Sequence, residues 1–219
     1  MTMEKHIFYS VCIISFAGSF LSTAVNIAIP VMSHEFGLTP DKLSWVVTAF
    51  LIPTAACLLP MGKVSDIYGR RKTYAAALLA FALTTAATAL ATTLPVLVAI
   101  RALQGIALSA VYVSYMPLLL ATTDEDRQGR ILGICVGLTY LGLSLGPVAG
   151  GLLTEYAGWR SIFLLSAAMA SAAYLFIRPV RQEWYANGAP FVNAVSSALS
   201  MAGIVLFLWG LSAYAETSL

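Results

Sequence analysis

Seven long apolar runs constrain this chain most, because each is about as long as a membrane-spanning helix. A helix needs about 20 predominantly apolar residues to cross the hydrocarbon core of a bilayer. The runs cover about residues 7–31, 43–61, 73–94, 96–120, 130–153, 161–178 and 191–213. We therefore predict an all-α integral membrane protein with seven transmembrane helices.

The composition agrees with a membrane protein and excludes an ordinary soluble globule. Hydrophobic residues make up 59% of the chain, 10% of the residues are charged, and the mean hydropathy is +0.84. A soluble domain is typically about 45–50% apolar and about 25% charged. The cations lie in short loops beside the apolar runs rather than in a separate basic domain. We therefore expect the lipid bilayer, and not nucleic acid, to be a partner.

The sequence offers no pattern for enzymatic chemistry. The two histidines, His6 and His34, lie at opposite ends of the first apolar run, and the three cysteines all fall within runs. A glycine-rich phosphate loop, a catalytic triad and a paired intramembrane carboxylate are also missing from the sequence. We expect neither a metal site nor a cofactor, and we predict that the protein is not an enzyme.

The cations predict the orientation of the chain in the membrane. With the N-terminus inside, the cytoplasmic segments hold Lys5, Lys63, Arg70, Arg71, Lys72, Arg127, Arg130, Arg178 and Arg181. The outer segments then hold only Lys42 and Arg160, and Arg101 lies within a run. Cytoplasmic loops of membrane proteins carry an excess of lysine and arginine. We therefore expect a multi-pass protein of the cell membrane with a cytoplasmic N-terminus.

A short basic loop joins the second and third runs, over residues 62–72. It reads Gly-Lys-Val-Ser-Asp-Ile-Tyr-Gly-Arg-Arg-Lys, with a lone aspartate between two glycines and three consecutive cations at its end. A topology loop explains the cations but not the aspartate or the glycines. The spacing resembles the signature loop between the second and third helices of the major facilitator superfamily of secondary transporters.

Four further motifs resemble the same family. Residues 101–105 are similar to its Arg-x-x-Gln-Gly signature, and residues 142–151 contain the Gly-Pro-x-x-Gly-Gly pattern of its antiporter branch. Residues 23–30 resemble the end of the first helix in drug:proton antiporters, and residues 159–163 match the Trp-Arg-x-x-Phe start of the sixth helix. The seventh run resembles the extra central helix of fourteen-span members.

The resemblance implies the major facilitator fold, with an N-terminal six-helix domain over residues 1–180. A cytoplasmic linker is expected at 181–190, and the seventh helix with a short outer tail at 191–219. The implied function is proton-coupled efflux of drugs or other amphipathic small molecules by alternating access. The expected partners are the small-molecule substrate, protons, and a C-terminal half in the same or another chain, or a second copy.

Polar residues on the first and fourth runs are candidates for substrate binding and coupling. Arg101 is the one charge within a run, and Gln104 and Tyr112 follow at i+3 and i+11 on roughly the same helix face. On the first run, Ser22 and Asn26 belong to a polar stripe, and we expect the Asn26 amide to be buried. Intramembrane ionisable residues usually mark a pathway. The alternative for Arg101 is a structural clamp that donates hydrogen bonds to helix-end carbonyls.

Two other groups are candidates for gating. In the fifth run, Gly142, Gly146 and Gly150 recur every four residues, so another helix can approach this stripe closely. Pro147 bends the helix, and the resemblance adds Gly151 to a patch that limits leak. In the basic loop, the resemblance implies a latch between the two transporter halves, formed by Gly62, Asp66, Gly69, Arg70 and Arg71. Asp66 has three candidate partners: Arg70, a neighbouring helix N-terminus, and Arg127 or Arg130.

One departure bears on coupling. Where drug:proton antiporters carry an aspartate in the first helix, this chain has Leu21. No acidic residue falls within the seven runs, so coupling would need a carboxylate elsewhere, another ion, or a role for Arg101 in exchanging charge. The alternative function is a non-transporting or degenerate half-transporter that acts as a membrane assembly or regulatory subunit.

Overall fold

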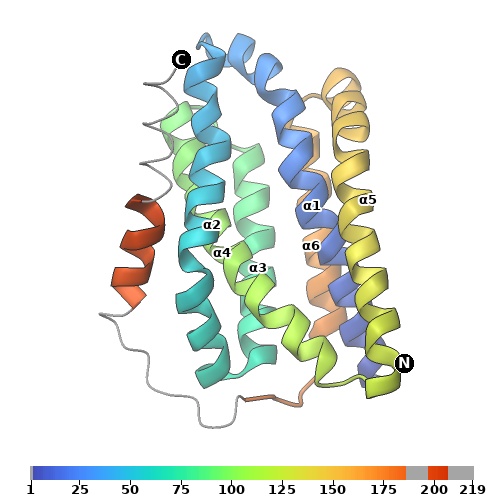
Figure 1. The fold of residues 1–219 in the computed structure, drawn as a ribbon. Helices are drawn as coiled ribbons and strands as arrows, with labels where there is room; N and C mark the ends of the chain where they lie inside the picture. The colour runs from blue at the N-terminus through green and yellow to red at the C-terminus, as the bar shows by residue number, and fades with distance from the viewer. Residues whose placement is uncertain (1, 186–196, 207–219) are drawn as a thin grey trace.

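Six long helices stand side by side in the computed structural model, which describes residues 2–185 and 197–206 (Figure 1). They are α1 (Met3–Phe36), α2 (Pro40–Tyr68), α3 (Arg70–Ala89), α4 (Leu94–Leu120), α5 (Glu125–Ala157) and α6 (Arg160–Ile177). Their order and approximate positions follow the first six apolar runs of the sequence. The described residues contain no strand.

Five of the six helices, all except α3, are long and apolar enough to cross a membrane. Helix α3 has 20 residues, but its three N-terminal cations and its four threonines lower its mean hydropathy. One face of α3 is nonetheless buried, with Tyr74, Leu78 and Phe81 fully enclosed. Large apolar side chains such as Leu83 and Leu152 are instead exposed on the outside of the bundle. This distribution is expected for helices that meet lipid or another helix bundle.

Several helix ends differ from the predicted bounds, for example α2, which ends at Tyr68 rather than near residue 61. Two of the differences have a clear local cause. The first span was expected to end near residue 31, yet α1 continues through Pro30 to Phe36 and ends at Gly37, which adopts a positive φ of 62°. A proline removes only one hydrogen bond, and a helix can continue past it with a kink. The third span was expected to reach residue 94, but α3 ends at Ala89, and Leu94 begins α4 with a proline in the first turn.

The predicted seventh span, 191–213, lies mostly outside the described residues. Within it, Ser197–Leu206 forms a short apolar helix. The linker predicted at 181–190 is described as far as residue 185, and this part is not helical.

The packing pattern repeats when the first three helices are exchanged with the last three. The most extensive contacts join α1 to α5 and α2 to α4, and the next join α3 to α4, α1 to α6, and α3 to α6. If α1, α2 and α3 are exchanged with α4, α5 and α6 in that order, the α1–α5 contact becomes the α2–α4 contact and the α3–α4 contact becomes the α1–α6 contact. The α3–α6 contact becomes itself. Such internal repeats are common in transporter folds. The exchange pairs α1 with α4, the two helices that carry the candidate polar residues.

Ion pairs and hydrogen bonds mark the two ends of the bundle. At the end where α2 passes into α3, Arg127 pairs with Glu4, and Arg71 bonds the end of α6. We call this the α2–α3 end, and it also holds the start of α1 (Figure 1). At the opposite end, Arg160 at the start of α6 pairs with Glu35 near the end of α1.

Candidate functional site

Arg101 of α4 lies inside the bundle, with 1% of its surface exposed. Its Nε donates to the carbonyl oxygen of Val46 on α2 at 3.0 Å, and its Nη1 donates to Gln104 Oε1 at 2.7 Å. Its guanidinium carbon lies 4.1 Å from the centre of the Phe50 ring and 5.8 Å from that of Phe163. No carboxylate pairs with Arg101 in the part of the chain that the structure describes. The charge is therefore stabilised by two oxygen acceptors and two aromatic faces.

Gln104 extends this polar contact to a third helix. It is fully buried, and its Nε2 donates to the Thr85 hydroxyl of α3 at 2.6 Å. A continuous chain of hydrogen bonds thus runs from α2 through α4 to α3. Buried polar networks of this kind hold helices in a fixed arrangement when every member is satisfied. Arg101 thus joins helices as a clamp would, but its backbone acceptor, Val46, lies within α2 and not at a helix end.

The candidate residues of α1 form a separate group. Ser22 is partly buried and donates to the Gly18 carbonyl at 2.9 Å, and the Asn26 amide donates to the Ser22 carbonyl at 3.3 Å. The expectation that Asn26 is buried is wrong, because Asn26 is exposed and none of the described helices covers its face of α1. Tyr112 of α4 approaches Gly18: its hydroxyl oxygen lies 3.0 Å from the position that a Cβ there would take. Among the described residues, no hydrogen bond joins this group to Arg101.

The glycine stripe of α5 lies directly against α1. A Cβ built on Gly142 would be 2.6 Å from the Phe16 carbonyl oxygen, and one on Gly150 would be 2.7 Å from the Ala24 Cβ. A Cβ on Gly146 would overlap the Thr23 hydroxyl oxygen. The predicted close approach is confirmed, and its partner is α1. Gly151 does not share it, because a Cβ there would make only an ordinary contact at 3.6 Å. Pro147 lies inside α5, which continues past it to Ala157.

Replacing Gly142 with alanine is expected to destabilise the contact between α1 and α5. The new methyl group would meet backbone atoms of Phe16 and Phe20, which cannot rotate away. Overpacking of this kind typically costs about 1–3 kcal/mol. Gly133→Ala on the same helix is the matched control, because nothing lies within 4 Å of its Cβ position. We expect a lower thermal midpoint in detergent for the first variant only, and equal midpoints would contradict the close packing.

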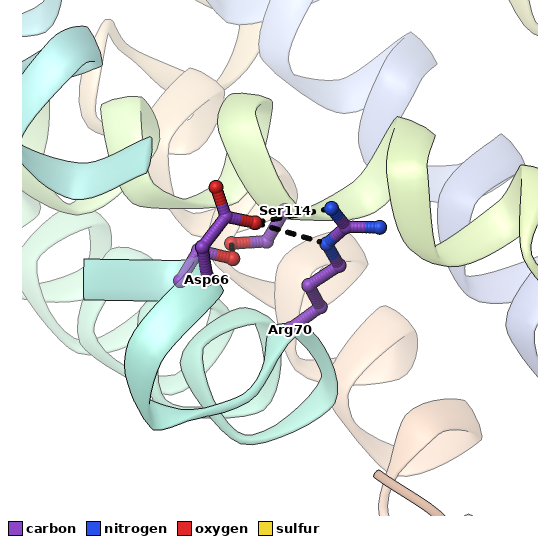
Figure 2. Close-up of polar contacts among 4 residues, drawn as sticks. Asp66, Arg70 and Ser114 are labelled. Carbon is purple, nitrogen blue, oxygen red and sulfur yellow. Dashed lines mark hydrogen bonds and ion pairs between the residues drawn. The ribbon is translucent and has the colours of Figure 1, made fainter. Parts of the chain in front are cut away.

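The prediction of a loop at residues 62–72 is wrong: residues 62–68 belong to α2 and residues 70–72 to α3, so only Gly69 lies outside a helix. This basic segment contains one ion pair among the described residues. Asp66 Oδ1 accepts from Arg70 Nη2 at 3.1 Å and from Nε at 3.2 Å, as Figure 2 shows. Both side chains are partly exposed, so the pair is accessible at the α2–α3 end. Arg127 pairs with Glu4 instead, and Arg70 is therefore the partner of Asp66 among the three predicted alternatives. Gly62 has open space around it, with nothing within 4 Å of its Cβ position.

Gly69 and Arg71 connect the loop to the segment that follows α6. Gly69 has a φ of 102°, which a residue with a side chain rarely adopts, and it separates α2 from α3. Arg71 donates to the Arg178 carbonyl oxygen at 3.0 Å, near the end of α6. Glu183 accepts from the backbone N–H of Lys72 at 3.0 Å, so its carboxylate lies at the positive end of α3. The interaction with a helix N-terminus that was one alternative for Asp66 is thus made by Glu183.

Two polar contacts lie outside the predicted set. The Ser114 hydroxyl of α4 donates to the Ser65 hydroxyl of α2 at 2.9 Å in a buried position close to the Asp66 ion pair (Figure 2). At the opposite end, Glu35 accepts from Trp159 Nε1 at 2.7 Å and from Arg160 at 2.7 Å. The Trp-Arg motif marked Trp159 and Arg160 in the sequence, but it could not indicate their partner Glu35, which lies 124 residues before Trp159. Among the described residues, no group of three or more potential metal ligands is close enough to hold an ion.

These features define a multi-pass helical membrane protein of the transporter class. The family model described as Major Facilitator Superfamily matches residues 11–218. The chain belongs to the major facilitator superfamily, and its described helices form the N-terminal bundle of the major facilitator fold.

Relatives with named functions include bacterial resistance and export proteins. The chain is 34% identical over 154 residues to the multidrug resistance protein Stp of Mycobacterium tuberculosis, covering 70% of this chain and 28% of Stp. It is 29% identical over 191 residues to the tetracenomycin C resistance and export protein of Streptomyces glaucescens, covering 87% and 36% of the two chains. It is 30% identical over 195 residues to the puromycin resistance protein of Streptomyces alboniger, covering 89% and 38%. The chain thus spans roughly a third of the length of these curated relatives.

Proposed function

We propose that this chain is the N-terminal bundle of a secondary active exporter that moves amphipathic small molecules by alternating access. The observation that carries the proposal is the paired packing of the six helices. Glycines bring α5 against α1 and α4 against α2 at backbone distance, which suits a bundle that acts as one rigid body. Rocking of such rigid bundles about a midplane site is how transporters with internal repeats alternate their access. The resistance and export proteins among the relatives support the same function.

We also propose that the protein lies in the cell membrane and that its N-terminus is on the cytoplasmic side. Support comes from the cations at the α2–α3 end, which exceed those at the opposite end. A reporter that is active only in the cytoplasm is expected to be active when it is fused before residue 2, and a reporter that is active only in the periplasm is expected to be inactive there. Activity of a periplasmic reporter at the same position would reverse the orientation.

A carboxylate that carries protons would have to lie within the membrane. The apolar parts of the described helices contain no acidic residue. Leu21 occupies the position where related antiporters carry an aspartate, and its side chain is fully buried. We propose that the coupling carboxylate belongs to the C-terminal half, in the same chain or a partner, which also completes the substrate site. Leu21 also favours the second candidate function, a non-transporting assembly or regulatory subunit.

Dye accumulation in pump-deficient bacteria tests the transport proposal against its alternative. Cells that express the full-length protein are expected to accumulate less ethidium than cells with an empty vector. Addition of a protonophore is expected to remove this difference, because the proton gradient drives export. Equal accumulation, with the protein shown to be present in the membrane, would favour the non-transporting function.

Asp66→Asn is expected to slow export several-fold while leaving substrate affinity unchanged. The ion pair with Arg70 is partly exposed, and such pairs contribute at most about 1 kcal/mol to stability. A change in turnover would therefore report a conformational role, as implied for a latch between the halves. Asp41→Asn is the matched control, because Asp41 is an exposed carboxylate at the other end of α2. A loss of binding with unchanged turnover would contradict the latch.

A further inference from the structure

An apolar groove runs along the outside of the bundle near the α2–α3 end. It has a volume of about 490 Å³ and is bordered by α2, α3 and α4. Its apolar lining includes Met61, Ile106 and five alanines: Ala76, Ala77, Ala80, Ala107 and Ala110. The alanines of α3 at the mouth, Ala76 and Ala80, are exposed. The small side chains leave a channel that the helices themselves do not fill.

The polar residues of this groove gather at one end. Tyr68, Lys72 and Thr73 line it beside the turn from α2 to α3, and each offers a hydrogen-bond donor. Lys72 is exposed, and no ion pair to its ammonium group occurs among the described residues. The rest of the lining is apolar. The groove therefore has the polarity of an amphiphile, with a donor-rich head end and a hydrocarbon tail end.

The charge around the head end is positive. Six cations belong to the turn and to the segment after α6: Lys63, Arg70, Arg71, Lys72, Arg178 and Arg181. The same segments hold two carboxylates, Asp66 and Glu183. Asp66 is paired with Arg70, and Glu183 accepts from the backbone N–H of Lys72. Lys72 is the one cation that lines the groove, so an anionic group there would meet its ammonium group directly.

We propose that this groove binds an anionic phospholipid. One acyl chain lies along the alanine wall, and the phosphate accepts from Lys72, Tyr68 and Thr73. Basic pockets between transmembrane helices on the cytoplasmic side are known to bind anionic headgroups. An apolar helix from a partner would fill the tail end but would leave the clustered donors without an acceptor. The proposal depends on insertion in a membrane and not on the export function.

Lipid retention by the purified protein tests the proposal. Native mass spectrometry in detergent, with added phosphatidylglycerol or phosphatidylcholine, measures how much of each lipid remains bound. We expect about tenfold tighter retention of phosphatidylglycerol. Lys72→Gln is expected to remove this preference, and Ala80→Phe is expected to reduce retention of both lipids. Lys42→Gln, at the opposite end, and Ala168→Phe, at an exposed alanine of α6, are the matched controls and should retain lipid as the unaltered protein does.

Several outcomes would overturn the proposal. Equal retention of the two lipids, or an unchanged preference in Lys72→Gln, would remove the headgroup site. Displacement of phosphatidylglycerol by millimolar inorganic phosphate would indicate a simple anion site without a lipid tail. If Ala80→Phe reduced the oligomer mass while lipid retention stayed the same, the occupant would be a second copy. Folding of each variant is checked by its thermal midpoint.

Discussion

Gly105→Ala is expected to lower the thermal midpoint of the protein strongly and to abolish transport. A Cβ on Gly105 of α4 would overlap the backbone carbonyl oxygen of Phe50 and lie 2.9 Å from the Thr54 hydroxyl of α2. Thr54 also donates to the Gly105 carbonyl, so the two helices are joined at this point by a hydrogen bond. Because the nearest atom is backbone, the clash is relieved only if α2 and α4 separate. The expected cost is at the upper end of the roughly 1–3 kcal/mol that overpacking typically causes.

The matched control for Gly105→Ala is Gly137→Ala, because open space surrounds its Cβ position. Alanine also favours a helix over glycine by about 1 kcal/mol, so the control is expected to be neutral or slightly stabilising. The measurement is the unfolding midpoint of detergent-purified protein, followed by a reporter fluorophore or by light scattering. If both variants unfolded at the same temperature as the unaltered protein, α2 and α4 would not meet at Gly105.

Arg101→Ala is expected to abolish export while the protein still inserts into the membrane. The change leaves the Val46 carbonyl and Gln104 Oε1 without their donor, and it removes the cation from between Phe50 and Phe163. A lost hydrogen bond to a buried charged group typically costs about 1.5–3 kcal/mol. Insertion depends on overall hydrophobicity, which the change increases. Dye export and the amount of protein in the membrane fraction measure the two properties separately.

Two further variants separate the possible roles of Arg101. Arg101→Met keeps much of the side-chain volume but removes the charge and the donors. Arg101→Lys keeps the charge, but a single ammonium group is expected to reach one of the two acceptors rather than both. Export by the methionine variant would show that packing is sufficient. Export by the alanine variant at the normal rate would remove Arg101 from the functional site.

Hydropathy predicted the helices well because lipid requires every spanning segment to satisfy its own backbone hydrogen bonds. It predicted their ends poorly, since helices extend beyond the apolar core until a capping residue stops them. Helix α2 thus continues past Lys63 and Asp66 and ends at Tyr68, before the positive φ of Gly69. Helix α1 likewise continues to Phe36, before Gly37. The third and fourth runs were separated correctly, although the break lies before Leu94.

The sequence pattern could not predict which helices pack against each other. The spacing of the α5 glycines predicted a smooth surface, but not that α1 covers it. The position of Arg101 predicted a buried charge, but its acceptors Val46 and Gln104 became known only from the packing of α2 against α4. Nothing in the sequence indicated that Glu183 bonds the start of α3, because this contact forms only when the segment after α6 folds back to α3. Polar residues in membrane helices find partners through tertiary packing rather than through local sequence.

Transport by the purified full-length protein in proteoliposomes tests the central proposal most directly. A pH gradient with an acidic lumen is imposed, and accumulation of ethidium inside the vesicles is followed by fluorescence. Exchange of protons for substrate predicts accumulation that depends on the gradient, stops when a protonophore is added, and is lost in Arg101→Ala. Accumulation equal to that of protein-free vesicles, by protein that is folded and inserted, would contradict an exporter driven by protons.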